Sequence, residues 1–145
     1  MRTLIFPPNV PYPTRYIIDP VAFFAALVGG PILFTALSFW FLFIPVFALV
    51  LGGPAYLIIG TPLLLWHLRH HHGDPDDLAW LAFKAIAVGI LGFVAVAAIT
   101  QNGGLFGVGM VYGGFAAIFG PAWAYFFGCV YARLRRDFFA KPRPF

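Results

Sequence analysis

The sequence predicts an all-α membrane protein with four transmembrane helices that form two hairpins. Of the 145 residues, 61% are hydrophobic and only 10% are charged, whereas roughly a quarter of the residues in soluble domains are charged. Residues 20–68 and residues 85–132 contain no Asp, Glu, Lys or Arg. Because one span needs about 20 residues, each stretch is too long for one helix and long enough for two. The alternating apolar and polar pattern of a membrane β-barrel is absent.

Residues 1–19 are predicted to form a proline-rich cytoplasmic arm. Four prolines between positions 7 and 13 favour an extended path without internal hydrogen bonds. The arm lacks the apolar core and small-residue cleavage site of a signal peptide, so we expect the first span to be retained. Asp19 and Pro20 then provide an N-cap and a preorganised first helical position. We therefore expect the first span to cover about residues 21–43.

Glycine and proline positions set the remaining boundaries of the membrane domain, which we place at residues 20–132. A turn near Ile44 and Pro45 leaves enough chain for a second span, because turning at Gly52 would leave only about 15 residues, about 22 Å of helix, before Arg69. The segment "TQNGG", residues 100–104, is the polar turn between the last two spans. The predicted second, third and fourth spans are residues 46–67, 75–100 and 105–132. We expect a kink at "GGP" in the second span, and a basic cytoplasmic tail at residues 133–145.

The charged residues predict the orientation of the chain. All of them lie in the arm, in the connection between the second and third spans, in the first turns of the third span, or in the tail. With four spans these places share one side of the membrane. Because Lys and Arg are concentrated on the cytoplasmic side of membrane proteins, we expect both termini to be cytoplasmic. Such a charge bias suits a multi-pass protein of a bacterial inner membrane.

Small residues recur at helical spacing in three of the predicted spans. Close approach through small side chains is a main route to helix association in lipid. Two uses of such a face are open: contact among the four helices of this chain, or contact with a partner subunit. The longest stripe lies in the fourth span and consists of Gly109, Gly113, Ala117, Gly120, Ala124 and Gly128; shorter ones are Ala22, Ala26 and Gly30, and Ala82, Ala85, Gly89 and Gly92.

All four histidines lie in the stretch "WHLRHHHGDPDDLAW", residues 66–80. His67, His70 and His71 would share one face of a continuing helix, as metal ligation requires. "HLRHH" resembles the HxxHH box of membrane-bound fatty-acid desaturases and hydroxylases, where several such boxes assemble an iron site. The chain has no histidine outside residues 67–72, so it cannot supply a full ligand set of that kind. We therefore favour a membrane boundary, in which the histidines extend a basic collar that begins at Arg69.

The acidic residues of this stretch have a structural explanation. Gly73 can end the second span as its C′ residue, Asp74 can cap the third, and Pro75 can take the first helical position. Asp76 and Asp77 then face the positive end of the helix dipole. No metal ion is needed to explain the acidic residues.

Aromatic and basic residues indicate contacts with lipid. Trp66 and Trp80 lie at the predicted cytoplasmic boundary, where aromatic side chains anchor membrane helices. The 18 phenylalanines suit lipid contact and are also compatible with a bound lipid, quinone or pigment, although no cofactor is predicted. Arg133, Arg135 and Arg136 are expected to contact anionic lipid headgroups or a partner. Nucleic acid is not an expected partner.

The membrane interior lacks the groups that transport and catalysis usually need. Transporters and intramembrane enzymes place ionisable side chains within the bilayer, whereas Lys84 lies near the start of its span and can extend to the interface. No phosphate-binding loop, nucleophile elbow or CxxC pair is found, so an enzyme is not expected. The sequence favours an accessory or structural subunit of a larger membrane protein complex. The alternatives are a small uncoupled channel that uses the fourth-span stripe, and a metal-dependent membrane enzyme that uses the histidine cluster.

Overall fold

The computed structural model describes residues 14–40, 44–136 and 143–144. Four helical segments in these ranges are long and apolar enough to cross a membrane, which confirms the predicted helical class and the number of helices of membrane-spanning length. The second of them, Ile44–His70, is one continuous segment made of three parts. In chain order the elements are β1 (Thr14–Arg15), α1 (Pro20–Leu37), α2 (Ile44–Ala55), the π-helix η1 (Tyr56–Gly60), α3 (Thr61–His70), α4 (Pro75–Ile99), α5 (Gly103–Leu134) and β2 (Arg143–Pro144).

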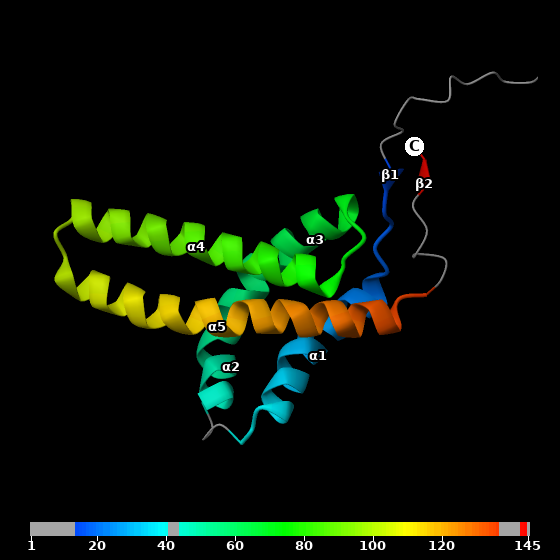
Figure 1. Ribbon diagram of the computed structural model, residues 1–145, viewed down its shortest axis with the longest axis horizontal. Coiled ribbons are helices and arrows are strands. Elements are labelled where there is room, and N and C mark those ends of the chain that lie inside the picture. The colour runs from blue at the N-terminus through cyan, green and yellow to red at the C-terminus, as the bar shows by residue number, and fades with distance from the viewer. Residues whose placement is uncertain (1–13, 41–43, 137–142, 145) are drawn as a thin grey trace, which may run out of the picture.

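Helix α5 is the centre of the fold. It packs along α4 and along α1, while the α2–η1–α3 segment makes fewer contacts with it (Figure 1). The two short strands pair antiparallel, with Thr14 opposite Pro144. The amide of Tyr16 donates to the carbonyl oxygen of Arg69 at 3.2 Å. The two described ends of the chain therefore lie together beside the end of α3, far from the turn between α4 and α5 (Figure 1).

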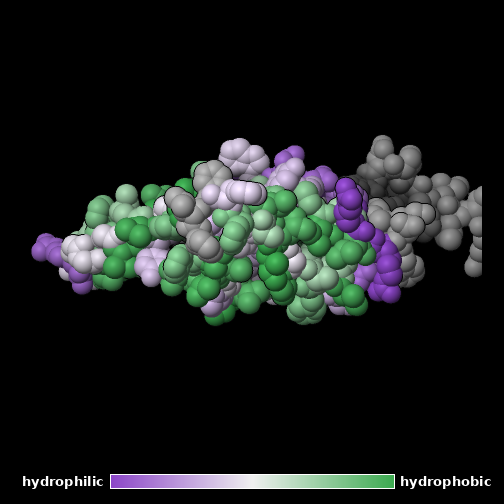
Figure 2. Space-filling view, turned by 90° about the horizontal axis from the view of Figure 1, so that it is seen from below, coloured by the Kyte–Doolittle hydropathy of each residue, from purple (hydrophilic) through white to green (hydrophobic). Residues whose placement is uncertain are grey.

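The main core lies where α1, α3, α4 and α5 meet. Phe23 of α1 and Phe127 of α5 are both buried, and their rings meet edge to face at 5.4 Å. Gly30 permits this close crossing, because a Cβ at that position would lie 2.7 Å from the backbone nitrogen of Phe127. Outside the core the surface is mainly apolar, with hydrophilic residues gathered toward the two ends of the face in Figure 2. This distribution suits a chain surrounded by lipid along its middle.

The first span begins as predicted and ends earlier than predicted. Asp19 caps α1, accepting hydrogen bonds from the amides of Val21 at 3.1 Å and Ala22 at 3.4 Å. Helix α1 ends at Leu37, and a turn follows at residues 38–40; the last predicted positions, 41–43, lie outside the described residues. The break predicted near Ile44 and Pro45 therefore lies a few residues earlier, and α2 begins at Ile44, two residues before the predicted start of the second span. Proline in a first helical turn costs little, since its missing N–H would have no partner there.

The second span changes its hydrogen-bonding pattern where the sequence predicts a kink. The π-helix begins at Tyr56, two residues after the last residue of the Gly52-Gly53-Pro54 stretch. Pro54 and Pro62 each remove one backbone donor from the helix, and the wider π turn lies between them. The remaining boundaries fall within three residues of the predicted ones: the second span ends at His70, the third at Ile99, and the fourth covers Gly103–Leu134.

Candidate functional site

An ion pair joins the start of the first span to the end of the last. Arg136 Nε donates to Asp19 Oδ2 at 2.9 Å, and one terminal nitrogen donates to Oδ1 at 3.2 Å. Asp19 is only 1% exposed, so its carboxylate needs these partners. The hydrogen bonds from Arg136 hold the pKa of Asp19 down at about 2, compared with an ordinary value of 3.8. The sequence predicted the cap and missed the arginine, 117 residues away.

Arg135 holds the connection between α3 and α4. Its guanidinium donates to the backbone oxygen of His72 at 3.1 Å and lies 2.9 Å from His72 Nε2. Because an arginine only donates, Nε2 is the acceptor and Nδ1 carries the hydrogen. Arg133 lies in the exposed last turn of α5. Two of the three arginines assigned to lipid headgroups thus also bind within the chain, and their contact with lipid or a partner stays a prediction.

The histidines at the end of α3 do not converge on one point. His67 is buried, and its ring stacks on that of His71 at 4.3 Å. His70 directs Nδ1 to the backbone oxygen of Trp66 at 2.8 Å, while His71 directs Nδ1 to that of His67 at 3.3 Å. His71 has left the helix, with φ −130° and ψ 160°. Within residues 14–40, 44–136 and 143–144, no three His, Cys, Asp or Glu side chains are placed to hold a metal ion.

The "GDPDD" stretch folds largely as predicted. Gly73 has a φ of +81°, which favours glycine, but it lies two residues after the cap residue His71 rather than directly after it. Asp74 occupies the N-cap position of α4, with Pro75 following. The Asp74 side chain makes no capping hydrogen bond, which corrects that part of the interpretation. Asp76 and Asp77 lie in the first turn.

The small-residue stripe of the fourth span faces α4. A Cβ on Gly109 would meet Phe93, one on Gly113 would meet Ile90, and one on Gly120 would meet Ile86. At the other end of the stripe, a Cβ on Gly128 would lie 2.7 Å from Pro75 Cα, and Ala124 is buried in the core. Ala117 is partly buried. In this chain the stripe therefore provides the contact between its last two helices.

The glycines of α4 lie on a face of that helix that is not covered by α5. A Cβ on Gly89 or Gly92 would meet no atom of the described chain within 4 Å. Both glycines are exposed, as is Val96 on the same side of the helix. In the whole of α4, only Leu78 and Ala97 are fully buried.

Trp66 and Trp80, the predicted interface anchors, are also exposed.

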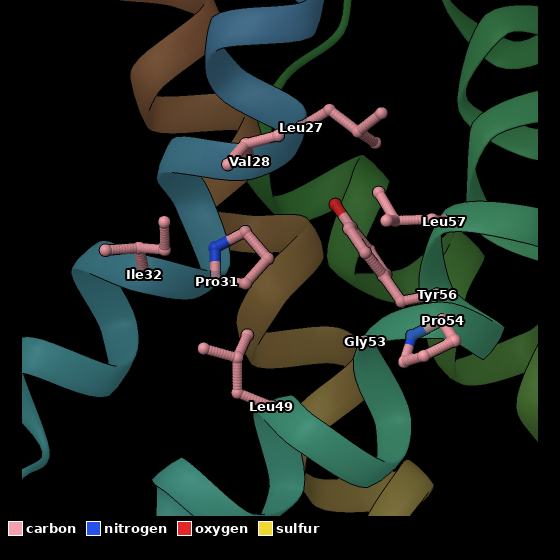
Figure 3. A pocket seen from close by; sticks show the side chains of 9 residues that line it. All are labelled: Leu27, Val28, Pro31, Ile32, Leu49, Gly53, Pro54, Tyr56 and Leu57. Carbon is pink, nitrogen blue, oxygen red and sulfur yellow. The ribbon is translucent and has the colours of Figure 1, made fainter.

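An apolar groove separates α1 from α2 and η1. Its volume is about 270 Å³, and Tyr56 is its one side chain with a polar group among the described residues (Figure 3). Leu27 and Pro31 of α1 form one wall, and Gly53 and Leu57 lie opposite. Sequence patterns did not reveal this groove, because its walls come from α1, α2 and η1, whose relative placement depends on α5. The closeness of "GGP" to a tyrosine in an otherwise apolar run was the available signal.

Together, these features define a multi-pass helical protein of membrane-spanning length whose polar contacts gather where its described ends meet. Comparisons with family models, curated proteins and solved structures gave no significant match.

Proposed function

We propose that the protein is an accessory, structural subunit of a larger integral membrane complex. In this proposal its four spans form two hairpins in a bacterial inner membrane, with both termini in the cytoplasm. The protein contributes helix packing and assembly, while other subunits carry out the chemistry. Anionic lipids contact the exposed basic residues at the cytoplasmic end.

The observation that carries the proposal is the open glycine face of α4. Glycine in a helix interior costs about 0.8 to 1.0 kcal/mol relative to alanine. Inside a membrane this cost is offset where glycine lets another backbone approach closely. The glycines of α5 do this within the chain, whereas Gly89 and Gly92 face no atom of the described residues. A helix of a partner subunit is the occupant that makes use of such a face.

The interior of the spans supports the same proposal. The charge-free stretches 20–68 and 85–132 hold no ionisable Asp, Glu, Lys or Arg for ion transfer or catalysis. Lys84 is the tenth of the 25 residues of α4 and is exposed, so its long side chain can extend toward the interface. Helix packing, and not ion transfer or catalysis, is therefore the function that the membrane domain is best suited to.

Affinity purification from native membranes tests this function. We expect the tagged protein to retain defined membrane partners in mild detergent, and the double variant Gly89→Leu with Gly92→Leu to lose them. Ala87→Leu with Ala98→Leu is the matched control, because these alanines lie on the side of α4 away from Gly89 and Gly92 and neither is buried. A homogeneous monomer without partners would contradict the proposal. Equal loss of partners in both double variants would remove the role assigned to the glycine face.

A further inference from the structure

Tyr56 places a polar group near the middle of the second span. It lies about midway between Ile44 and His70 and is the first residue of η1. Its hydroxyl oxygen is buried and has no hydrogen-bond partner among the described residues. A hydroxyl without a partner in an apolar medium is costly, and the hydrocarbon core offers no water to supply one. A compensating acceptor is therefore missing at this position.

The surrounding residues hold the tyrosine ring beside the groove. Trp123 of α5 meets the ring edge to face at 5.5 Å and is itself buried. A Cβ on Gly52 would come within 3.3 Å of the Trp123 ring, so this glycine gives the tryptophan its space. A Cβ on Gly53 would meet nothing within 4 Å, so the second glycine leaves the groove open. The first glycine of "GGP" thus accommodates the Trp123 ring, and the second leaves space in the groove.

The π turn adds to this arrangement. Isolated π segments within α-helices are rare and occur frequently at functional sites. Here the segment starts at the residue that carries the unpaired hydroxyl. In Figure 3 the ring of Tyr56 runs along the groove, with its oxygen directed toward Leu27. Leu57, the next residue along the chain, also lines the groove and is 44% exposed.

We propose that this groove binds an apolar ring compound of the quinone class, with the Tyr56 hydroxyl donating a hydrogen bond to a ring carbonyl. The walls that the structure describes carry no charge, which suits a neutral ligand. The position of Tyr56 near the middle of the span favours a quinone carbonyl over a phospholipid carbonyl. The hydrocarbon core is about 30 Å thick, and the ester carbonyls of phospholipids lie at its edges, whereas a ring on an isoprenoid tail can reach its middle. This ligand site is independent of the proposed role as a subunit.

Binding of decylubiquinone to the purified full-length protein in dodecyl maltoside tests the proposal. We expect saturable binding by the wild type, measured by isothermal titration calorimetry. Tyr56→Phe should weaken binding about five- to tenfold, because one hydrogen bond is lost. This variant removes no hydrogen bond made within the described residues, and helical circular dichroism should confirm that it folds. Tyr112→Phe is the matched control, since Tyr112 lies on α5, is 55% exposed and does not line the groove.

A second variant fills the groove without touching the hydroxyl. Gly53→Leu adds a side chain where the described chain leaves room, and we expect it to abolish saturable binding while the protein keeps its helical spectrum. No saturable binding by the wild type would overturn the proposal, as would equal affinity in wild type and Tyr56→Phe. Native mass spectrometry distinguishes the other carbonyl source. A phospholipid that the wild type retains, that Tyr56→Phe loses and that decylubiquinone does not displace would also overturn it.

Discussion

Replacing Gly128 by alanine measures how tightly α5 packs against the start of α4. The new Cβ would lie 2.7 Å from Pro75 Cα, about 0.7 Å closer than the 3.4 Å at which ordinary contact begins. Because the obstacle is backbone, no rotamer change relieves it, and the two helices must move apart. Overpacking of this kind typically costs about 1 to 3 kcal/mol. Gly114→Ala in the same helix is the control, because its Cβ would meet nothing within 4 Å.

The difference between the two variants isolates the steric cost. Both replace glycine by alanine inside α5 and neither precedes a proline, so the gain in helix propensity is common to both and cancels. We expect Gly128→Ala to be less stable than Gly114→Ala by about 1 to 3 kcal/mol. Reversible unfolding in mixed dodecyl sulfate and maltoside micelles, followed by tryptophan fluorescence, measures the free energy of unfolding of each. Equal stability of the two variants would refute the close packing of Gly128 on Pro75.

Three further predictions concern the polar ends of the helices. The lowered pKa of Asp19 means that its carboxylate stabilises the folded state above about pH 4, and that this contribution is lost as the pH falls from about 4 to about 2. Asp19→Asn keeps the cap and should remove that part of the acid-unfolding profile. An unchanged profile would contradict the pairing with Arg136. Asn102 accepts a hydrogen bond from the Leu105 amide at 3.1 Å, so Asn102→Ala should lower the free energy of unfolding by about 0.5 to 2 kcal/mol, with Asn102→Ser as the capping control in the same unfolding assay. Gly73→Ala forces a φ of +81° on alanine and brings its Cβ onto the Leu68 side chain, so chemical unfolding should show a loss of about 1 to 3 kcal/mol, and a neutral effect would rule out this turn geometry.

Local rules predicted the features that depend on neighbouring residues in the chain. The two charge-free stretches predicted four membrane-length helices, and the Asp19-Pro20 pair predicted the start of the first. Proline was harder to interpret, since Pro45 lies in the first turn of a helix while Pro54 precedes a π turn. A proline removes one donor wherever it stands, and only the surrounding bonds decide whether the helix starts, bends or ends there.

Features that join distant parts of the chain were not predictable in the same way. The spacing of Gly109, Gly113 and Gly120 identified a packing face, but it did not specify that α4 would cover it. Arg136 was assigned to lipid because a basic tail after a final span is typical of cytoplasmic ends. Nothing in the sequence connects it with Asp19, whose local role as a cap was already complete. The groove at Tyr56 likewise requires α1, α2 and α5 to be placed together.

The pairing of Asp19 with Arg136 sets an order for the biogenesis of the protein. Asp19 is made early, and its guanidinium partner is made 117 residues later, after all four spans have been synthesised. Until then the first span has its cap but not its ion pair, and the carboxylate must stay hydrated at the membrane surface. Closure of the bundle is therefore a late step, completed only after Arg136 has emerged from the ribosome.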